Sequence, residues 1–433
     1  MKMRNLIETF GWIFISFAIM KRHFILFWLF TVCACTTLTA QDFVITEYGA
    51  STDSTQINTQ AIQRAIDKAS ENGGTVVIPK GVFLTGALFF KPGTHLRLSE
   101  GAVLKGSDNI ADFPLIPSRM EGHNLLYYAA VINAYFNDGF TITGPGTING
   151  NGLKYWKIFW NGRDSMRKVG KEFTNLEAHR PRLVFIWGCH NVKISGVKLW
   201  NSPFWTTHLY QCENVLIENC DIRSPFRPVP APSSDAIDID VCRNVTVRGC
   251  YISVNDDGVC MKGGKGPEAH KRYENGAVED ILVENCTFGE VHAALTMGSE
   301  CIHARNIVMR NCKVDNNRPI LNLKMRPDTY QLYENITVEH ITGKCGTILN
   351  MAPWTQYFDM KGSKEKPYAT VRNITISDIN VTCDKFATIH GNPSDTVSSI
   401  VFKNITATAK DSAVTNIYKD VKFENVSLNG KKL

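Results

Sequence analysis

The chain after about residue 185 repeats a short pattern in which apolar and polar positions alternate. Segments such as NVTVRGCYI (244–252) and NITISDINV (373–381) have apolar residues at their second and fourth positions. Alternation with a period of two is typical of a short strand with one buried face. Nine such segments begin 21 to 38 residues apart, at positions 191, 214, 244, 280, 306, 335, 373, 399 and 420. This self-similarity predicts a repeat architecture.

Two further positions of the repeat indicate how the chain turns. The sixth holds Asn, Gly, Asp or His, types that tolerate the left-handed backbone conformation of a tight corner. The seventh is apolar in every copy: Val197, Cys220, Cys250, Cys286, Cys312, Ile341, Ile379, Ile405 and Val426. A strand, a corner, a second strand and a longer return loop make one coil of a parallel β-helix. Stacked coils would place the seventh-position side chains above one another, about 4.8 Å apart.

Most of the 13 cysteines occupy repeat positions that Val and Ile also fill. Cys189, Cys212 and Cys242 form a similar column two residues before their repeats. Buried free cysteine behaves as a small hydrophobe, so we expect reduced cysteines in the core. A disulfide framework is the alternative, because neighbouring coils are close enough for a bridge.

The region before the repeats predicts a cap for the β-helix. Residues 58–70 place Ala and Ile on one face and are followed by Gly73 and Gly74, the pattern of an amphipathic helix with a stop signal. A β-helix has an open apolar end that such a helix can cover. Short strands within 75–106 and 131–149 then form the first coils. We therefore expect an all-β fold: one parallel β-helix domain over residues 41–433.

Residues 1–40 have the pattern of a secretory signal. Lys21 precedes the apolar run 24–32, and small residues lead to Gln41. Met20 is then the expected start of translation. The pattern predicts an exported protein, in the periplasm or outside the cell.

A second apolar patch at 12–19 makes a membrane anchor the alternative, and Cys35 lies in a loose lipoprotein cleavage pattern that would give a lipid anchor at the cell surface. We expect no stable membrane span after processing. The remaining composition, 44% hydrophobic and 20% charged, is that of an ordinary soluble domain. The formal charge of +6 falls to +3 beyond residue 40, which argues against nucleic acid as a partner. A monomer is expected.

Asp256 and Asp257 stand side by side, and Asp235 precedes Asp256 by 21 residues. That separation fits a single coil, so the three carboxylates should meet on one face. Three clustered carboxylates repel, and indicate either a bound cation or acid–base chemistry in which one group stays protonated. Asp238 and Asp240 alternate with isoleucines and are interpreted as a solvated strand face.

The motifs of this region resemble those of the polygalacturonase family, glycoside hydrolase family 28. The resemblance runs from about residue 48 to at least 326 and includes TQAIQRAIDKA, GTINGNG and NSPFW. Four motifs correspond to the family's Asn-Thr-Asp, paired Asp, Gly-His-Gly and Arg-Ile-Lys: Ser233-Ser234-Asp235, Asn255-Asp256-Asp257-Gly258, Val291-His292-Ala293 and Asn322-Leu323-Lys324. The resemblance implies a single-stranded right-handed β-helix of the pectate-lyase type. It also implies hydrolysis of α-linked galacturonate in pectin, without a metal or cofactor.

The resemblance also implies roles for individual residues. Asp256 would protonate the glycosidic oxygen, while Asp235 and Asp257 would hold and activate the attacking water. An inverting enzyme needs its two carboxyl groups about 6.5–9.5 Å apart, so that water fits between them. His292 would position the acid and the substrate. Lys324 would bind the sugar carboxylate.

The chain departs from the family pattern at the substrate motif. Asn322 stands where the family usually has Arg, which removes a bidentate partner for a carboxylate. Arg326 or Lys262 is expected to compensate. Ser233 and Ala293 replace the usual Asn and Gly, which implies an altered subsite.

Two other segments bear on substrate choice. The long basic loop 263–280 is expected to wall off one end of the cleft and to favour release of single sugars from chain ends. Trp354 and Tyr357 are candidates to stack on a sugar. Homogalacturonan and rhamnogalacturonan both remain candidate substrates.

Two alternatives have different chemistry. A pectate lyase shares the β-helix but uses calcium, for which the three aspartates would serve as ligands. A β-helix that binds polysaccharide without cleaving it would lack turnover altogether.

Overall fold

The computed structural model describes residues 41–433 except residues 54 and 417. The segment from Asp42 to Leu433 forms one compact unit. The leader and anchors expected from residues 1–40 lie outside the described residues. No described helix is long and apolar enough to cross a membrane.

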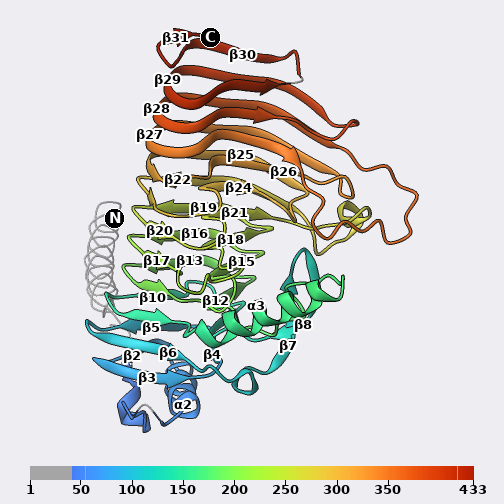
Figure 1. Cartoon of the computed structure of the whole chain (residues 1–433). Helices are drawn as coiled ribbons and strands as arrows, with labels where there is room; N and C mark the ends of the chain where they lie inside the picture. The colour runs from blue at the N-terminus through green and yellow to red at the C-terminus, as the bar shows by residue number, and fades with distance from the viewer. Residues whose placement is uncertain (1–40, 54, 417) are drawn as a thin grey trace, which may run out of the picture. The chain divides into compact units, whose positions relative to one another are not determined.

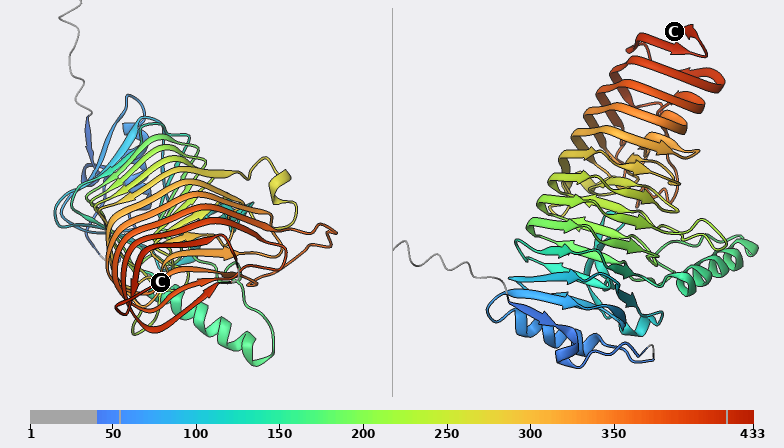
Figure 2. Two further views of the ribbon diagram at one scale, coloured as in Figure 1. Left: turned by 90° about the horizontal axis from the view of Figure 1, so that it is seen from above. Right: turned by 90° about the vertical axis from the view of Figure 1, so that its left-hand side faces the viewer.

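Successive coils of the chain stack in three rows of parallel strands, which confirms the expected right-handed parallel β-helix (Figures 1 and 2). The first row comprises β1 (Asp42–Val44), β2 (Gly74–Ile78), β5 (Thr94–Leu98), β10 (Thr141–Thr143), β13 (His190–Ser195), β16 (Glu213–Glu218), β19 (Arg243–Arg248), β22 (Ala277–Glu284), β25 (His303–Asp315), β27 (Gln331–Pro353), β28 (Ala369–Ile389), β29 (Thr396–Asn416) and β30 (Val421–Leu428). The second row comprises β3 (Gly81–Thr85), β6 (Ala102–Gly106), β11 (Thr147–Asn149), β14 (Lys198–Trp200), β17 (Asp221–Arg223), β20 (Tyr251–Ser253) and β23 (Thr287–Phe288). The third comprises β4 (Leu88–Phe90), β9 (Ile132–Tyr135), β12 (Val184–Trp187), β15 (Thr207–Tyr210), β18 (Ile237–Asp240), β21 (Val259–Lys262), β24 (Leu295–Met297) and β26 (Pro319–Met325). In the later coils β25, β27, β28 and β29 run through more than one row without a break.

A few elements stand outside the rows. Helix α2 (Thr59–Ala69) lies beside the first coils, and helix α3 (Leu153–Lys168) projects from the stack (Figure 2). Strands β7 (Leu115–Met120) and β8 (His123–Tyr128) form an antiparallel hairpin. Strand β31 (Lys431–Lys432) pairs antiparallel with β30.

The repeat positions behave as the sequence predicts. Every seventh-position side chain is at most 3% exposed, and in the later coils the register places Cys312, Ile341, Ile379 and Ile405 opposite one another. Every sixth-position residue has a positive φ, from 53° at Asn219 to 74° at Gly196. The column therefore fills the core, and the corner residue turns each coil.

The first position of the repeat carries a second corner that the sequence analysis did not separate. Most of its residues also have a positive φ. Their side chains hydrogen-bond from coil to coil, as in Asn244 Nδ2 to Asn214 Oδ1 (2.6 Å) and Asn373 Nδ2 to Asn335 Oδ1 (3.1 Å). This asparagine ladder uses the polar side chains of the corners to fix the coil stacking.

Helix α2 is the predicted cap. It buries Ala61, Ile62, Ala65, Ile66 and Ala69, which belong to the same apolar cluster as the coil interiors. These positions recur at three- and four-residue intervals, so they form one face. The helix thereby removes the open end of the first coil from water.

The eleven described cysteines are all free and buried, as expected for core columns. Burial raises the pKa of Cys189 to about 12, which disfavours the reactive thiolate. We expect the native protein to show almost no reaction of these cysteines with a thiol reagent, and full reaction after denaturation. Its melting temperature should not change on adding a reductant. A melting temperature that falls with reductant would reveal a disulfide.

Candidate active site

The three predicted aspartates lie in the turns before two neighbouring strands of the third row. Ile237 of β18 is paired with Val259 of β21. The chain just before them is also paired, because the Asp257 carbonyl accepts a hydrogen bond from the Ala236 amide (3.0 Å). Asp235 therefore lies one coil from Asp257, as the residue spacing predicted.

The paired aspartates occupy a bend between β20 and β21, which allows both to reach one cleft. The Asp257 amide donates to Asp256 Oδ1 (3.0 Å). One carboxylate oxygen from each of Asp235, Asp256 and Asp257 lies within 4.8 Å of the other two. The three carboxyl groups therefore share one small volume of the cleft.

Two cations from the next coils approach this cluster. Lys324 Nζ on β26 donates to Asp257 Oδ2 (2.6 Å). His292, in the turn before β24, has its Nδ1 3.4 Å from Asp256 Oδ1, and its amide donates to the Asp256 carbonyl (2.8 Å). Among the described residues, Asp235 is the member of the cluster without such an ion pair. The structure thus brings together Asp235, Asp256, Asp257, His292 and Lys324, as the motifs predicted.

These neighbours separate the pKa values of the carboxyl groups. Burial, and then the charge of Asp256, raise the pKa of Asp235 well above its ordinary value. Burial opposes ionisation of Asp256 too, but the hydrogen bond and charge of His292, with Lys324, lower its pKa to about 2. In return, Asp256 raises the pKa of His292 against the opposing effect of burial. Of these two groups Asp235 is therefore the one that favours the proton, whereas the resemblance assigns the acid role to Asp256.

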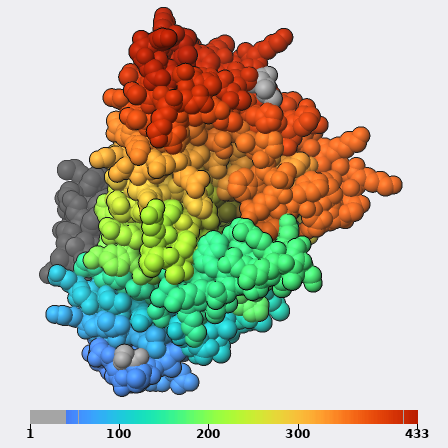
Figure 3. Space-filling view, in the orientation of Figure 1, coloured from blue at the N-terminus to red at the C-terminus, as the bar shows by residue number. Residues whose placement is uncertain are grey.

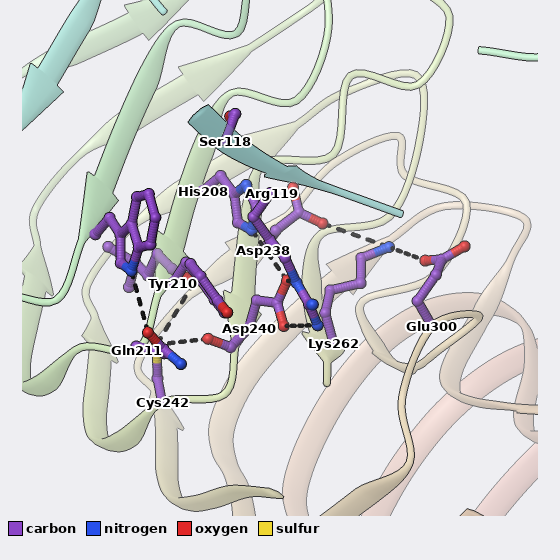
Figure 4. Close-up of polar contacts among 12 residues, drawn as sticks. Ser118, Arg119, His208, Tyr210, Gln211, Asp238, Asp240, Cys242, Lys262 and Glu300 are labelled. Atoms are coloured by element: carbon purple, nitrogen blue, oxygen red, sulfur yellow. Dashed lines mark hydrogen bonds and ion pairs between the residues drawn. The ribbon is translucent and has the colours of Figure 1, made fainter. Parts of the chain in front are cut away.

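Lys262 belongs to a buried polar layer with Asp238 and Glu300 (Figure 4). Its Nζ is 3.1 Å from Glu300 Oε2 and 3.5 Å from Asp238 Oδ1, and it stands over the Trp205 ring at 4.7 Å. Lys262 lines the cleft, but its charge is already balanced. It does not replace the missing family arginine as a free cation.

Asp238 and Asp240 are fully buried, so their interpretation as a solvated strand face is wrong. The β7–β8 hairpin covers this face, and Arg119 of β7 pairs with Asp240 through Nε (3.0 Å) and Nη2 (3.3 Å) (Figure 4). His208 Nε2 lies 3.3 Å from the same carboxylate. Burial raises the pKa of Asp238 to about 8. Alternation alone could not reveal a hairpin inserted more than a hundred residues earlier.

Arg326 does not reach the cleft. It is fully buried and makes a two-pronged ion pair with Asp328, through Nε (2.7 Å) and Nη2 (2.6 Å). It also donates to the carbonyls of Gln356 (2.9 Å) and Tyr357 (3.2 Å). Its position therefore contradicts the expectation that it substitutes for the missing arginine, and indicates a structural role in holding the segment around Tyr357.

Asn322 does line the cleft, where its Oδ1 accepts a hydrogen bond from Asn350 Nδ2 of the next coil (2.8 Å). Ser233 lines it as well. An amide pair thus stands where the family pattern has a guanidinium. It offers hydrogen bonds but no charge.

The cleft has a volume of about 750 Å³ and opens as a hollow between the green and orange parts of Figure 3. Trp354 and Tyr357 line it as proposed, and Lys324 Nζ stands over the Trp354 ring at 4.7 Å. Several residues that line the cleft were not among the predicted site residues. Most of them lie on and after α3: Trp160, Arg163, Arg167, Lys171, Phe173 and Arg318. The alternation of aromatic and basic residues over 155–173 was the available signal. It was overlooked because this segment stands outside the repeat.

The cluster of Asp235, Asp256 and Asp257 is also a candidate site for a metal ion. Its three oxygens have the right chemistry for calcium. However, Lys324 is bound to Asp257 and His292 to Asp256. Two resident positive groups oppose a divalent ion there, so the residues fit acid–base chemistry better than a calcium site.

The model of the family described as "Glycosyl hydrolases family 28" matches residues 71–432. The chain belongs to this family. An "Exo-poly-alpha-D-galacturonosidase" of Dickeya chrysanthemi is 29% identical over 307 residues, which cover 62% of this chain and 49% of the relative. The chain therefore spans about half the length of that protein.

Two further similar proteins are covered over most of their length. An "Endo-polygalacturonase" of Pectobacterium carotovorum subsp. carotovorum is 25% identical over 359 residues, 81% of this chain and 84% of the relative. The crystal structure of an exopolygalacturonase from Thermotoga maritima superposes with a TM-score of 0.74 at 23% identity, covering 91% of this chain and 93% of that one. The similarity to the Thermotoga maritima structure supports the β-helix fold.

Proposed function

We propose that this family 28 protein hydrolyses α-linked galacturonate bonds in pectic chains. The observation that carries the proposal is the cluster of three aspartates with Lys324 and His292 in one cleft. Hydrolysis of a glycosidic bond requires one protonated and one ionised carboxyl group. The raised pKa of Asp235 and the lowered pKa of Asp256 give the cluster one group of each kind. Lys324 and Arg318 line the cleft and supply positive charge for a uronate, although Lys324 also pairs with Asp257. The names of the relatives agree with this substrate.

We assign the acid role to Asp256, the most exposed carboxylate of the cluster, with 24% of its side chain accessible. Asp235 and Asp257 are almost fully buried and would orient the water. Because Asp235 is the one of the two that favours the proton in the free protein, the proton must pass to Asp256 when a substrate enters. The two oxygens lie within 4.8 Å, so a short shift of side chains or one water completes the transfer. His292 positions Asp256.

We propose further that attack proceeds from a chain end. The loop 263–276 is tied to later coils by the Gly266 amide to Thr329 Oγ1 (2.9 Å) and by Lys271 Nζ to Glu365 Oε1 (2.8 Å). Tyr357 in turn reaches the Phe173 carbonyl (3.5 Å). Tyr357 and Phe173 both line the cleft, so their contact supports a wall at one side of it. Among the described residues no member of the loop lines the cleft itself; the loop backs this wall through Lys265, whose Nζ stands over the Tyr357 ring at 5.5 Å. An exo-acting enzyme should release monogalacturonate from the first turnovers, whereas mixed oligomers would indicate internal cleavage.

The test of the reaction is proton NMR of the protein from Gln41 acting on polygalacturonate and on rhamnogalacturonan oligosaccharides, with chelator present. A β-anomeric reducing sugar formed first would support inverting hydrolysis. An α-anomer formed first would overturn inversion. An unsaturated uronate, or activity only after calcium is added, would instead establish a lyase. Binding without turnover would establish a non-catalytic β-helix.

The pH dependence of activity follows from the shifted pKa values of Asp235 and Asp256. The active cluster holds one proton, on the group whose pKa is raised. Activity should therefore persist well above the ordinary range of an aspartate and be lost as the pH rises through the raised pKa of Asp235. On the acid side it should persist until Asp256, with a pKa of about 2, is protonated. Profiles of kcat/KM against pH report these groups in the free enzyme. An alkaline limb at the ordinary pKa of aspartate would contradict the assignment.

We also propose, from the leader pattern, that the protein acts outside the cytoplasm, where pectic chains are found.

A further inference from the structure

Three basic side chains of the α3 arm, residues 153–173, face the cleft without a carboxylate partner. Arg163, Arg167 and Lys171 all line it. None of the three forms an ion pair within the part of the chain that the structure describes. Arg163 stacks on the Trp160 ring at 5.2 Å, which leaves its five N–H groups free for a ligand.

The arm is anchored to the β-helix, so these cations are held at the cleft wall. The Tyr155 hydroxyl donates to the Ser107 carbonyl (3.1 Å) and Trp156 Nε1 to the Ser202 carbonyl (3.0 Å). Trp160 Nε1 donates to the Pro230 carbonyl (2.8 Å). Such fixing lowers the entropic cost of using the arm as a binding surface.

The reaction centre already has its own positive group. Lys324 lies against Asp257, and Arg318 lines the same cleft from the turn before β26. One galacturonate carries one carboxylate, and these residues suffice for it. The cleft volume of about 750 Å³ lies in the upper part of the range of about 300–1,000 Å³ typical of ligand sites, so more than one sugar can be accommodated. The cations of the arm are therefore free to bind the carboxylate of a second sugar in the cleft.

We propose that Arg163, Arg167 and Lys171 form a second uronate subsite, which binds the carboxylate of another galacturonate in the same chain. This inference rests on the proposed function and narrows it. A chain of consecutive galacturonates presents carboxylates at both places. A chain in which galacturonate alternates with neutral rhamnose carries a carboxylate only on every second sugar, so it leaves one place empty when neighbouring sugars occupy the two places. The arm thus selects homogalacturonan over rhamnogalacturonan.

The test compares the double variant Arg163→Gln/Arg167→Gln with the matched control Lys157→Gln/Lys168→Gln. Lys157 and Lys168 are exposed on the same helix but do not line the cleft. The substrates are trigalacturonate and an aryl α-galacturonide that carries a single carboxylate. Loss of charge-assisted bonds should raise the KM for trigalacturonate by about ten- to a hundredfold in the arm variant, and leave the aryl substrate unaffected. The control should match the wild type on both.

The outcomes separate the two proposals. A wild type that cleaves neither galacturonide overturns the proposed function. A wild type that is active, with an arm variant indistinguishable from the control, overturns the second subsite alone. Equal losses on both substrates also overturn it, because they would place the arm at the reacting sugar. As a second readout, the KM of the wild type for trigalacturonate should rise with salt more steeply than that of the arm variant.

Discussion

Replacing Asp256 with asparagine should lower kcat on polygalacturonate by about a thousandfold, within the range of 10²–10⁴ for a general acid. Asparagine keeps the shape of the side chain but has no proton to give to the glycosidic oxygen. The protein should remain folded, since Asp256 is the most exposed of the three carboxylates and its replacement removes one partly exposed ion pair, with His292. Thermal unfolding of the variant is the control.

A matched Asp235→Asn variant tells the acid from the groups that orient water. An aryl galacturonide has a leaving group that departs without protonation, so it should restore much of the rate to whichever variant lacks the acid. We expect rescue of Asp256→Asn and none of Asp235→Asn. The reverse result would place the acid where the resting proton lies, on Asp235, and would overturn our assignment.

Replacing Arg326 with methionine should lower the free energy of unfolding by about 3–5 kcal/mol, because Asp328 would then be a buried charge without its partner. Both side chains are fully buried. The carbonyls of Gln356 and Tyr357 would lose donors as well. Chemical denaturation of the two proteins measures the difference.

Arg318→Met is the control for this change. Arg318 is exposed and lines the cleft, so its loss should leave stability almost unchanged and should act on substrate binding instead. If Arg326→Met kept full stability and lost only affinity for galacturonate, Arg326 would be a binding residue after all.

The fold could be predicted from the sequence because its signals are local. Alternating apolar positions, a corner residue with positive φ and an apolar seventh position recur in every coil, and each depends only on neighbours within a few residues. The carboxylates could be placed for the same reason, since a parallel stack converts one coil of separation into contact. The cap helix needed no more than the periodicity of its apolar face.

The parts that could not be predicted depend on segments outside the repeat. Burial of Asp240 requires Arg119 from a hairpin that precedes it by more than a hundred residues. The pairing of Arg326 with Asp328 requires knowing that the following segment covers both. The ionisation of Asp235 and Asp256 depends on which of them His292 touches, and no spacing along the chain contains that information.

The corner asparagines and the apolar column recur along the stack, so neither feature depends on how many coils the molecule has. Deleting the coil that lies between β21 and β26 would leave a well-packed stack without the present contact of Asp257 with Lys324 and without His292. Gain or loss of a coil beyond β28 would leave that geometry untouched. We therefore expect related enzymes to differ in length towards the carboxyl end and to share one coil count between the aspartates and the lysine. Between the aspartates and Lys324, side chains can change during evolution but the number of coils cannot.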